Sequence, residues 1–140
     1  MAKLVARDVY FAINGTVLSD HVSSVTFEDT ADEVEFTAFG PNAYREFGQG
    51  LHDATITATF FQDFAANSVH TILQPLYASG GTFSVELRPT SSAVSSTNPK
   101  VTMVSRIYGY GGLGADVGDA MTFDATFRNA GTAGPVWGTS

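Results

Sequence analysis

The chain has 140 residues, which fits one domain, and it carries 7 basic and 14 acidic side chains for a net charge of −7. Its hydrophobic content of 44% excludes a disordered tail, and no apolar run approaches the roughly 20 residues of a membrane-spanning helix. The acidic balance disfavours binding to nucleic acid through its phosphates, and the absence of cysteine excludes disulfides and thiolate metal sites.

Windows of alternating apolar and polar residues predict β-strands along most of the chain. In the first window Asn14-Gly15 predicts a tight hairpin turn, because this pair adopts the positive φ angles that such a turn requires. The apolar positions of the windows are Val9, Phe11 and Ile13; Val25 and Phe27; Val34 and Phe36; Ile56, Ala58 and Phe60; Phe83, Val85 and Leu87; Val101 to Val104, running on to Ile107; and Phe123, Ala125 and Phe127. Seven or eight strands predict a mainly β fold, a β-sandwich or barrel.

Residues 63–79 are the exception, because their apolar residues have helical spacing. These residues are Val69, Ile72, Leu73, Leu76 and Tyr77. Asp63 or Asn67 is expected to cap the start of the helix and Gly80 its end, and Pro75 is expected to cause a kink or an early stop near Gln74. The helix is expected to lie against one face of the sheet.

Five stretches have no clear pattern. Residues 29–53 form a long connection, rich in glycine, in which only residues 34–37 look ordered. Residues 89–99 and 109–118 are expected to be mobile connections, with Leu113 and Val117 as their only apolar anchors. The ends, residues 1–7 and 130–140, are also irregular, and the lone Trp137 in the last of them predicts a partner surface. Residues 1–8 do not fit a secretory signal, so we expect cytoplasmic synthesis.

Patterns that would indicate an enzyme or a metal protein are weak. His21, His52 and His70 lie in three different contexts, which disfavours a catalytic triad or a metal site. The acidic run 28–35 lacks the spacing of a calcium loop, and the glycines of 109–114 are not followed by a helix or a lysine. The aromatic pairs Phe60-Phe61 and Tyr108/Tyr110 are expected to serve packing or a subunit contact. The sequence therefore predicts neither catalysis, nor a metal, nor a cofactor.

Four stretches together resemble a known family, the tail tube (major tail) proteins of long-tailed, non-contractile bacteriophages. They are the strand lead-in LSDHVSSV at 18–25; TAFG at 37–40 together with GLHDATI at 50–56; FFQD at 60–63, which leads into the helix; and GDAMTFDATFRNAG at 118–131. The very tight Asn-Gly turn and Ala130, where a serine is common, depart from the family pattern.

The resemblance implies a single domain over 1–140, a β-sandwich with one flanking helix at 63–79. It implies that six copies close into a ring through edge-strand pairing and that rings stack into a hollow tube, which delivers double-stranded DNA without binding it specifically. It implies further partners, namely the tape measure, tail terminator and tail-tip proteins, and a place in the virion after assembly in the host cytoplasm.

The resemblance also assigns candidate residues. Residues 29–53 would be the inter-ring loop, with Phe39, Tyr44, Arg45 and Phe47 as its contact residues. Residues 1–7 and 130–140 would be inter-subunit arms, ordered only on assembly, through Leu4, Val5, Val136 and Trp137. A channel for DNA should be polar or acidic, because basic side chains would trap phosphates. The candidates for its lining are Thr55, Thr57, Thr59, Glu86, Asp124 and Thr126.

Two alternatives remain open at this point. One is a related tube subunit of a contractile injection or secretion machine, or a head-to-tail connector component, which would share the fold. The other is a small monomeric sandwich that binds a glycan or another protein.

Overall fold

Eight strands, one α-helix and one 3₁₀ turn make up the described part of the computed structural model, residues 3–41 and 43–140. Residues 1–2 of the expected N-terminal arm and residue 42 of the expected loop lie outside it. In chain order the elements are β1 Tyr10–Ile13, β2 Thr16–Val17, the 3₁₀ turn η1 Ser19–His21, β3 Val22–Glu35, β4 Phe47–Phe61, α1 Val69–Ser79, β5 Phe83–Arg88, β6 Lys100–Ile107, β7 Thr122–Asn129 and β8 Val136–Gly138.

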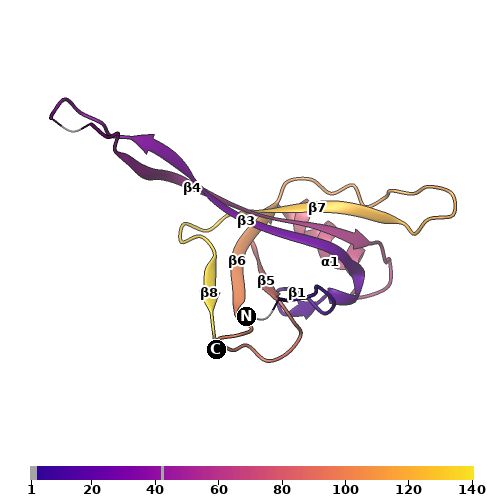
Figure 1. Cartoon of the computed structure of the whole chain (residues 1–140). Coiled ribbons are helices and arrows are strands. Elements are labelled where there is room, and N and C mark those ends of the chain that lie inside the picture. The colour runs from indigo at the N-terminus through magenta and orange to yellow at the C-terminus, as the bar shows by residue number, and fades with distance from the viewer. Residues whose placement is uncertain (1–2, 42) are drawn as a thin grey trace.

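The strands form one antiparallel sheet in the order β2-β1-β5-β6-β7-β4-β3. Strand β6 pairs with β5 along one edge, whereas its other edge is shared between β8 at residues 100–102 and β7 at residues 105–107. The sheet folds over at this short β6–β7 pairing, so that β1 faces β4. The rings of Phe11 on β1 and Phe60 on β4 show this, since their centroids lie only 5.5 Å apart. The result is a two-layer sandwich of β2-β1-β5-β6 and β7-β4-β3 (Figure 1), which confirms the predicted fold class.

The core lies between the two layers and follows the alternation in the sequence. On β4 the even-numbered residues from Ala54 to Phe60 are buried, and β5, β6 and β7 bury every second residue in the same way. The ring of Phe60 stacks on that of Phe123 at 5.4 Å and meets Phe127 edge-on at 6.3 Å. Since burying one such side chain contributes about 1.5 to 3 kcal/mol, this aromatic cluster contributes substantially to stability.

The helix begins later than expected and is not interrupted by its proline. It starts at Val69 instead of residue 63, because Ser68 is the N-cap and its backbone amide donates to the Thr71 hydroxyl at 2.9 Å. It continues through Pro75 to Ser79, so the expected early stop is wrong. The predicted end at Gly80 is confirmed, since this residue has φ 67°. Val69 and Leu73 are buried in the core.

Residues 29–53 are far more regular than expected. Strands β3 and β4 pair from Val22–Phe60 out to Glu35–Phe47 with irregularities near both ends, and they leave only residues 36–46 between them. The outer part of this pair leaves the body as a long hairpin (Figure 1). The interpretation of 29–53 as an irregular loop is therefore wrong. In contrast, the tight turn at Asn14-Gly15 is confirmed, with φ of 49° and 84°.

The two expected mobile connections are tied down by hydrogen bonds. In 89–99 the buried amide of Asn98 donates to the Ser92 carbonyl at 2.9 Å and accepts from the Thr90 amide at 3.0 Å. In 109–118 the Gln62 side chain donates to the Gly112 carbonyl at 2.6 Å. Leu113 and Val117, the expected apolar anchors of 109–118, are both exposed.

Candidate functional site

The tip of the β3–β4 hairpin carries large apolar side chains with no contact to the body. Phe39 and Tyr44 are almost completely exposed, and Phe47 is half exposed. Arg45 lies beside them and is also exposed. Leu51, which the sequence did not single out, is exposed further down β4. An exposed apolar group of this size is typical of a protein contact surface.

Two glycines in the stem of the hairpin leave room for apolar side chains of the opposite strand. Val34 on β3 and Phe36 directly after it lie across Gly50 and Gly48 on β4, so that a Cβ on Gly48 would collide with the Phe36 ring, and one on Gly50 would lie 2.7 Å from Val34 Cγ2. A side chain at either glycine would displace its apolar partner. The sequence contains this arrangement as Val-x-Phe at 34–36 and Gly-x-Gly at 48–50. These two patterns indicate paired strands only if a strand is already expected in each segment.

The two terminal arms differ from each other. Leu4 and Val5 are exposed in a segment without secondary structure. Val136 and Trp137 instead belong to β8, which pairs with β6 of the same chain, and the Trp137 ring meets Phe27 edge-on at 5.9 Å. The expectation that both arms order only on assembly is therefore wrong for residues 136–138. Trp137 is still 60% exposed, so a large part of it remains free for another contact.

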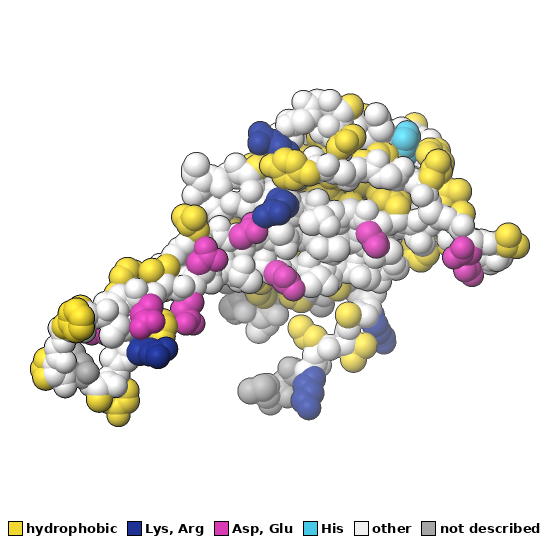
Figure 2. All heavy atoms as spheres, turned by 90° about the horizontal axis from the view of Figure 1, so that it is seen from above, with side chains coloured by type: hydrophobic (Ala, Val, Ile, Leu, Met, Phe, Trp, Pro, Cys, Tyr) yellow, Lys and Arg dark blue, Asp and Glu magenta, His cyan; other side chains and the backbone are white. Residues whose placement is uncertain are grey.

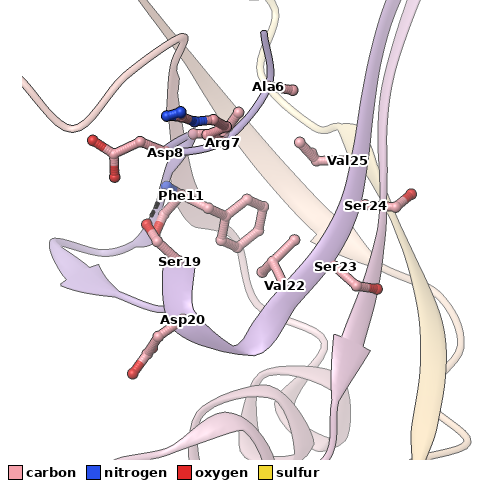
Figure 3. Close-up of a pocket in the computed structure, with 11 residues that line it drawn as sticks. Ala6, Arg7, Asp8, Phe11, Ser19, Asp20, Val22, Ser23, Ser24 and Val25 are labelled. Carbon is pink, nitrogen blue, oxygen red and sulfur yellow. Dashed lines mark hydrogen bonds between the residues drawn. The ribbon is translucent and has the colours of Figure 1, made fainter.

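A groove of about 520 Å³ lies between the N-terminal segment and the start of β3 (Figure 3). Phe11, Val22 and Val25 point into it from the two layers, and Arg7, Asp8 and Asp20 lie at its margin. The backbone amide of Phe11 donates to the Ser19 hydroxyl at 2.9 Å, which holds η1 against β1. The groove lies between the β1 side of one layer and the free edge of β3 in the other, which do not pair with each other.

Five of the six lumen candidates share one face of the sandwich. In the β4–β7 register Thr57 is paired with Thr126 and Thr59 with Asp124, and the Thr59 hydroxyl donates to Asp124 at 2.6 Å. Thr55 lies on the same face of β4. Glu86 is the exception, because it lies on β5 in the other layer, where Arg88 Nε donates to its carboxylate at 2.6 Å.

This outer face of β3, β4 and β7 has a negative balance. Glu28, Asp53 and Asp124 contribute three carboxylates in the body, and Glu33 and Glu35 two more in the hairpin, against the one guanidinium group of Arg128, which gives −4. Arg128 donates to Asp53 at 2.6 Å, so its charge is already engaged. Figure 2 shows this face as a mostly uncharged surface with scattered charges of both signs.

At the other end of β4, a second group of exposed apolar side chains surrounds the β6–β7 connection. We define this distal end by its exposed apolar residues, Phe61, Phe64, Leu113, Val117 and Met121. Its base is fixed by Tyr110, whose hydroxyl lies 2.9 Å from Gln62 Nε2 and 2.7 Å from His70 Nδ1. The amide of Thr122 also donates to the Gly114 carbonyl at 3.1 Å. The distal end is therefore exposed but anchored.

A histidine links the start of β3 to the segment before α1. The Nδ1 of His21 lies 2.8 Å from Asp20 Oδ1, and its Nε2 lies 3.0 Å from Asp63 Oδ2. Hydrogen bonds from the Ala65 amide and the Ser68 hydroxyl lower the pKa of Asp63, and the contact with His21 lowers it further. This carboxylate organises the turn into the helix, and it is not among the residues that line the groove beside the N-terminal segment.

The described residues contain no group of three or more histidine, aspartate and glutamate side chains that could hold a metal. The aromatic pairs serve packing in part: Phe60 is fully buried and Tyr110 is half-buried, whereas Phe61 and Tyr108 remain exposed. The single helix of the described chain, with 11 residues, is too short to cross a membrane.

No protein-family model matches the sequence, and neither does any curated protein. Solved structures do match. The SPP1 tail tube aligns with a TM-score of 0.76 at 12% identity, over 99% of this chain and 80% of that one. A chain of the native gene transfer agent virion aligns with a TM-score of 0.73, and a chain of the tail of the empty gene transfer agent particle, determined with C6 symmetry, with 0.68. Both are 12% identical; the alignments cover 94% of this chain in each case, and 95% and 93% of those chains. The predicted tail tube fold is thus confirmed over nearly the whole chain.

Proposed function

We propose that this chain is a structural subunit of a phage-like tail tube, which assembles with identical copies into rings and stacks of rings. The observation that carries the proposal is the extension of β3 and β4 beyond the body into a hairpin with an exposed aromatic tip. A domain that contacts no other protein gains nothing from such a hairpin, whereas a repeating assembly uses it as a contact. The subunit would be made in the bacterial cytoplasm and would reside in the virion tail.

Ring closure would use the free edges of the sheet. Strand β3 has 14 residues and pairs on one side with β4, and no described strand pairs with its other side. A long free edge is a site for pairing with another chain, and natural proteins rarely leave one uncovered. Leu4 and Val5 of the N-terminal segment, and the exposed part of Trp137, would add contacts between neighbours. The C6 symmetry of the gene transfer agent tail supports six copies in the ring.

The lumen would be lined by the outer face of β3, β4 and β7. Its candidates are Thr55, Thr57, Thr59, Asp124 and Thr126, and Glu86 is left out because it lies on the opposite layer. Hydroxyl groups and paired charges offer few free cations to phosphates, so double-stranded DNA and a tape measure protein would pass without being retained. Tail terminator and tail-tip proteins would bind the two ends of the stack.

The first test is negative-stain electron microscopy and analytical ultracentrifugation of the purified full chain. We expect rings or tubes. A chain that stays monomeric at all concentrations and binds sugar would overturn the proposal in favour of the glycan-binding alternative. A subunit of a contractile machine would also form tubes, and genes for a sheath beside its own gene would identify that case.

The contribution of the hairpin is tested by replacing residues 36–46 with Asn-Gly. This pair forms a two-residue turn that closes directly on the Glu35–Phe47 pair, so the body should fold unchanged. We expect the variant to form no tubes and to keep its free energy of unfolding within about 0.5 kcal/mol. A matched control replaces Thr132 and Ala133, in the exposed turn before β8, with Gly-Gly. Tubes of normal length from the hairpin variant would reject the assignment of the hairpin as the stacking contact.

A further inference from the structure

We propose that the hairpin tip of one copy docks on the distal end of the next copy along the tube axis. The inference rests on the proposed function and names the surface that receives the hairpin. The contact would be heterologous, with two different surfaces meeting, so that each subunit keeps one of each free for further growth.

The placement of the two surfaces carries the first part of the argument. The hairpin tip and the distal end lie at opposite ends of the same strand, since β4 begins at Phe47 beside the tip and ends at Phe61 within the distal end. Figure 1 shows the hairpin and the β6–β7 connection projecting in opposite directions from the body. With 15 residues at about 3.3 Å each, β4 is about 50 Å long. A shift of the molecule along this strand brings one surface to the other, and repeated shifts give an unlimited stack.

The chemistry of the two surfaces is complementary. Both are apolar: the tip exposes Phe39 and Tyr44, and the distal end exposes Leu113 and Val117. One charge pairing is available between them. The tip, residues 36–46, carries one basic side chain, Arg45, and one acidic side chain, Glu46, whereas the distal connection, residues 108–121, carries Asp116 and Asp119 and no basic residue, so Arg45 can pair with an aspartate there. Figure 2 shows apolar side chains at both ends of the molecule and acidic side chains beside them at the end opposite the hairpin.

The distal end is also ordered by hydrogen bonds before any partner binds. The hydrogen bonds of Gln62 with Tyr110 and Gly112 hold the base of its connection in place, and the Asp119 amide donates to the Asp116 carbonyl at 3.1 Å, which forms a turn at its tip. An anchored surface loses little conformational entropy on binding, which favours association.

The groove beside the N-terminal segment is the main competing receptor. It is apolar at its floor, but its margin carries Arg7 as well as Asp8 and Asp20. Arg45 would therefore be repelled by one charge there and attracted by two. It is also recessed between the layers at the free edge of β3, whereas the β6–β7 connection projects from the body along the direction of β4 (Figure 1). The distal end fits the hairpin better on both counts.

Cysteine cross-linking tests the proposal directly, because the chain has no cysteine of its own. Three double variants are assembled and then treated with a short bismaleimide: Tyr44→Cys with Leu113→Cys, Tyr44→Cys with Ser23→Cys at the groove, and Tyr44→Cys with Val17→Cys on β2. We expect a ladder of covalent multimers on a denaturing gel from the first pair alone. The single variant Tyr44→Cys is the matched control and should give no ladder.

The outcomes separate the inference from the function on which it rests. Tubes with a ladder from the groove pair, from Tyr44→Cys alone or from no pair would overturn the docking proposal while keeping the proposed function. Absence of tubes from the unmodified chain under every condition would overturn both.

Charge reversal gives a second and independent readout. Arg45→Asp alone, and Asp116→Arg with Asp119→Arg alone, should each reduce the amount of tube recovered by sedimentation, because like charges then meet at the contact. The combination of all three changes should restore it. A combined variant no better than the single ones would contradict the pairing of these two surfaces.

Discussion

Strand β4 passes through two very different environments. From Ala54 to Phe60 every second side chain is buried between the layers, whereas Phe47 and Leu51, on the same strand, are exposed in the hairpin. The body therefore has its own core, whereas the hairpin has strand pairing and the local packing of Val34 and Phe36 over its two glycines. Since a two-stranded hairpin is marginal by itself in water, this one is held by its continuity with the body.

The difference separates stability from assembly. Changes in the body should alter the free energy of unfolding, and changes in the hairpin should alter contacts between copies. The following experiments test that separation, from the largest expected effect to the smallest.

The largest effect is expected from Phe60→Ala. It removes the ring that joins β4 to Phe11 in the other layer and to Phe123 in its own, and it should cost about 3 to 5 kcal/mol. The matched change Phe36→Ala in the hairpin should stay within about 0.5 kcal/mol. Denaturant unfolding of the unassembled chain measures both. A large loss from Phe36→Ala would show that the hairpin belongs to the cooperative core.

A smaller effect is expected from Gly80→Ala at the end of α1. With φ 67° this residue is in the left-handed region, so alanine should cost about 1 kcal/mol. Gly40→Ala in the hairpin tip is the control, because the residue lacks a positive φ and a Cβ there would meet nothing within 4 Å. In thermal unfolding, the melting temperature of Gly80→Ala should be clearly lower than that of the unmodified chain, and the melting temperature of Gly40→Ala should equal it. Equal melting temperatures for both would contradict the assigned C-cap.

The smallest effect is expected in the pH dependence of stability, from Asp63→Asn. Because hydrogen bonds hold the pKa of Asp63 below its unfolded value, its contribution is present above that value and is lost as the pH falls through the folded pKa. Asp63→Asn should thus be less stable than the unmodified chain at pH 7, and the gap should narrow between about pH 5 and pH 3. Glu35→Gln, in the hairpin, is the control and should follow the unmodified chain throughout. A gap that stays constant with pH would contradict the role of the carboxylate.

The sequence was sufficient to predict the body. Alternation at Ile56, Ala58 and Phe60, or at Phe83, Val85 and Leu87, is created by burial on one face, and the structure buries these residues. The same reasoning failed in the hairpin, because Val34, Phe36 and Phe47 are all exposed and no single buried face imposes a pattern on 29–53. A segment that buries no face within its own chain has only a weak alternating pattern in its sequence.

Two further features could not be predicted, because they depend on individual side-chain hydrogen bonds that an alternating pattern does not reveal. Asn98 fixes residues 89–99 through carbonyl groups of its own loop, and Gln62 fixes the β6–β7 connection from the end of β4. Glu86 was grouped with the lumen candidates because it alternates like Thr57 and Thr59, but alternation gives the face of a strand and not the layer to which the strand belongs.

The continuity of β4 also has a mechanical consequence. A pull on the hairpin along its length would act parallel to β4, so that the hydrogen bonds joining it to β7, from Thr55–Arg128 to Phe61–Thr122, would bear the load together in shear. Hydrogen bonds loaded in shear must rupture simultaneously, whereas a force perpendicular to the strands would break them one after another. The hairpin is thus fastened to the domain along its most resistant direction.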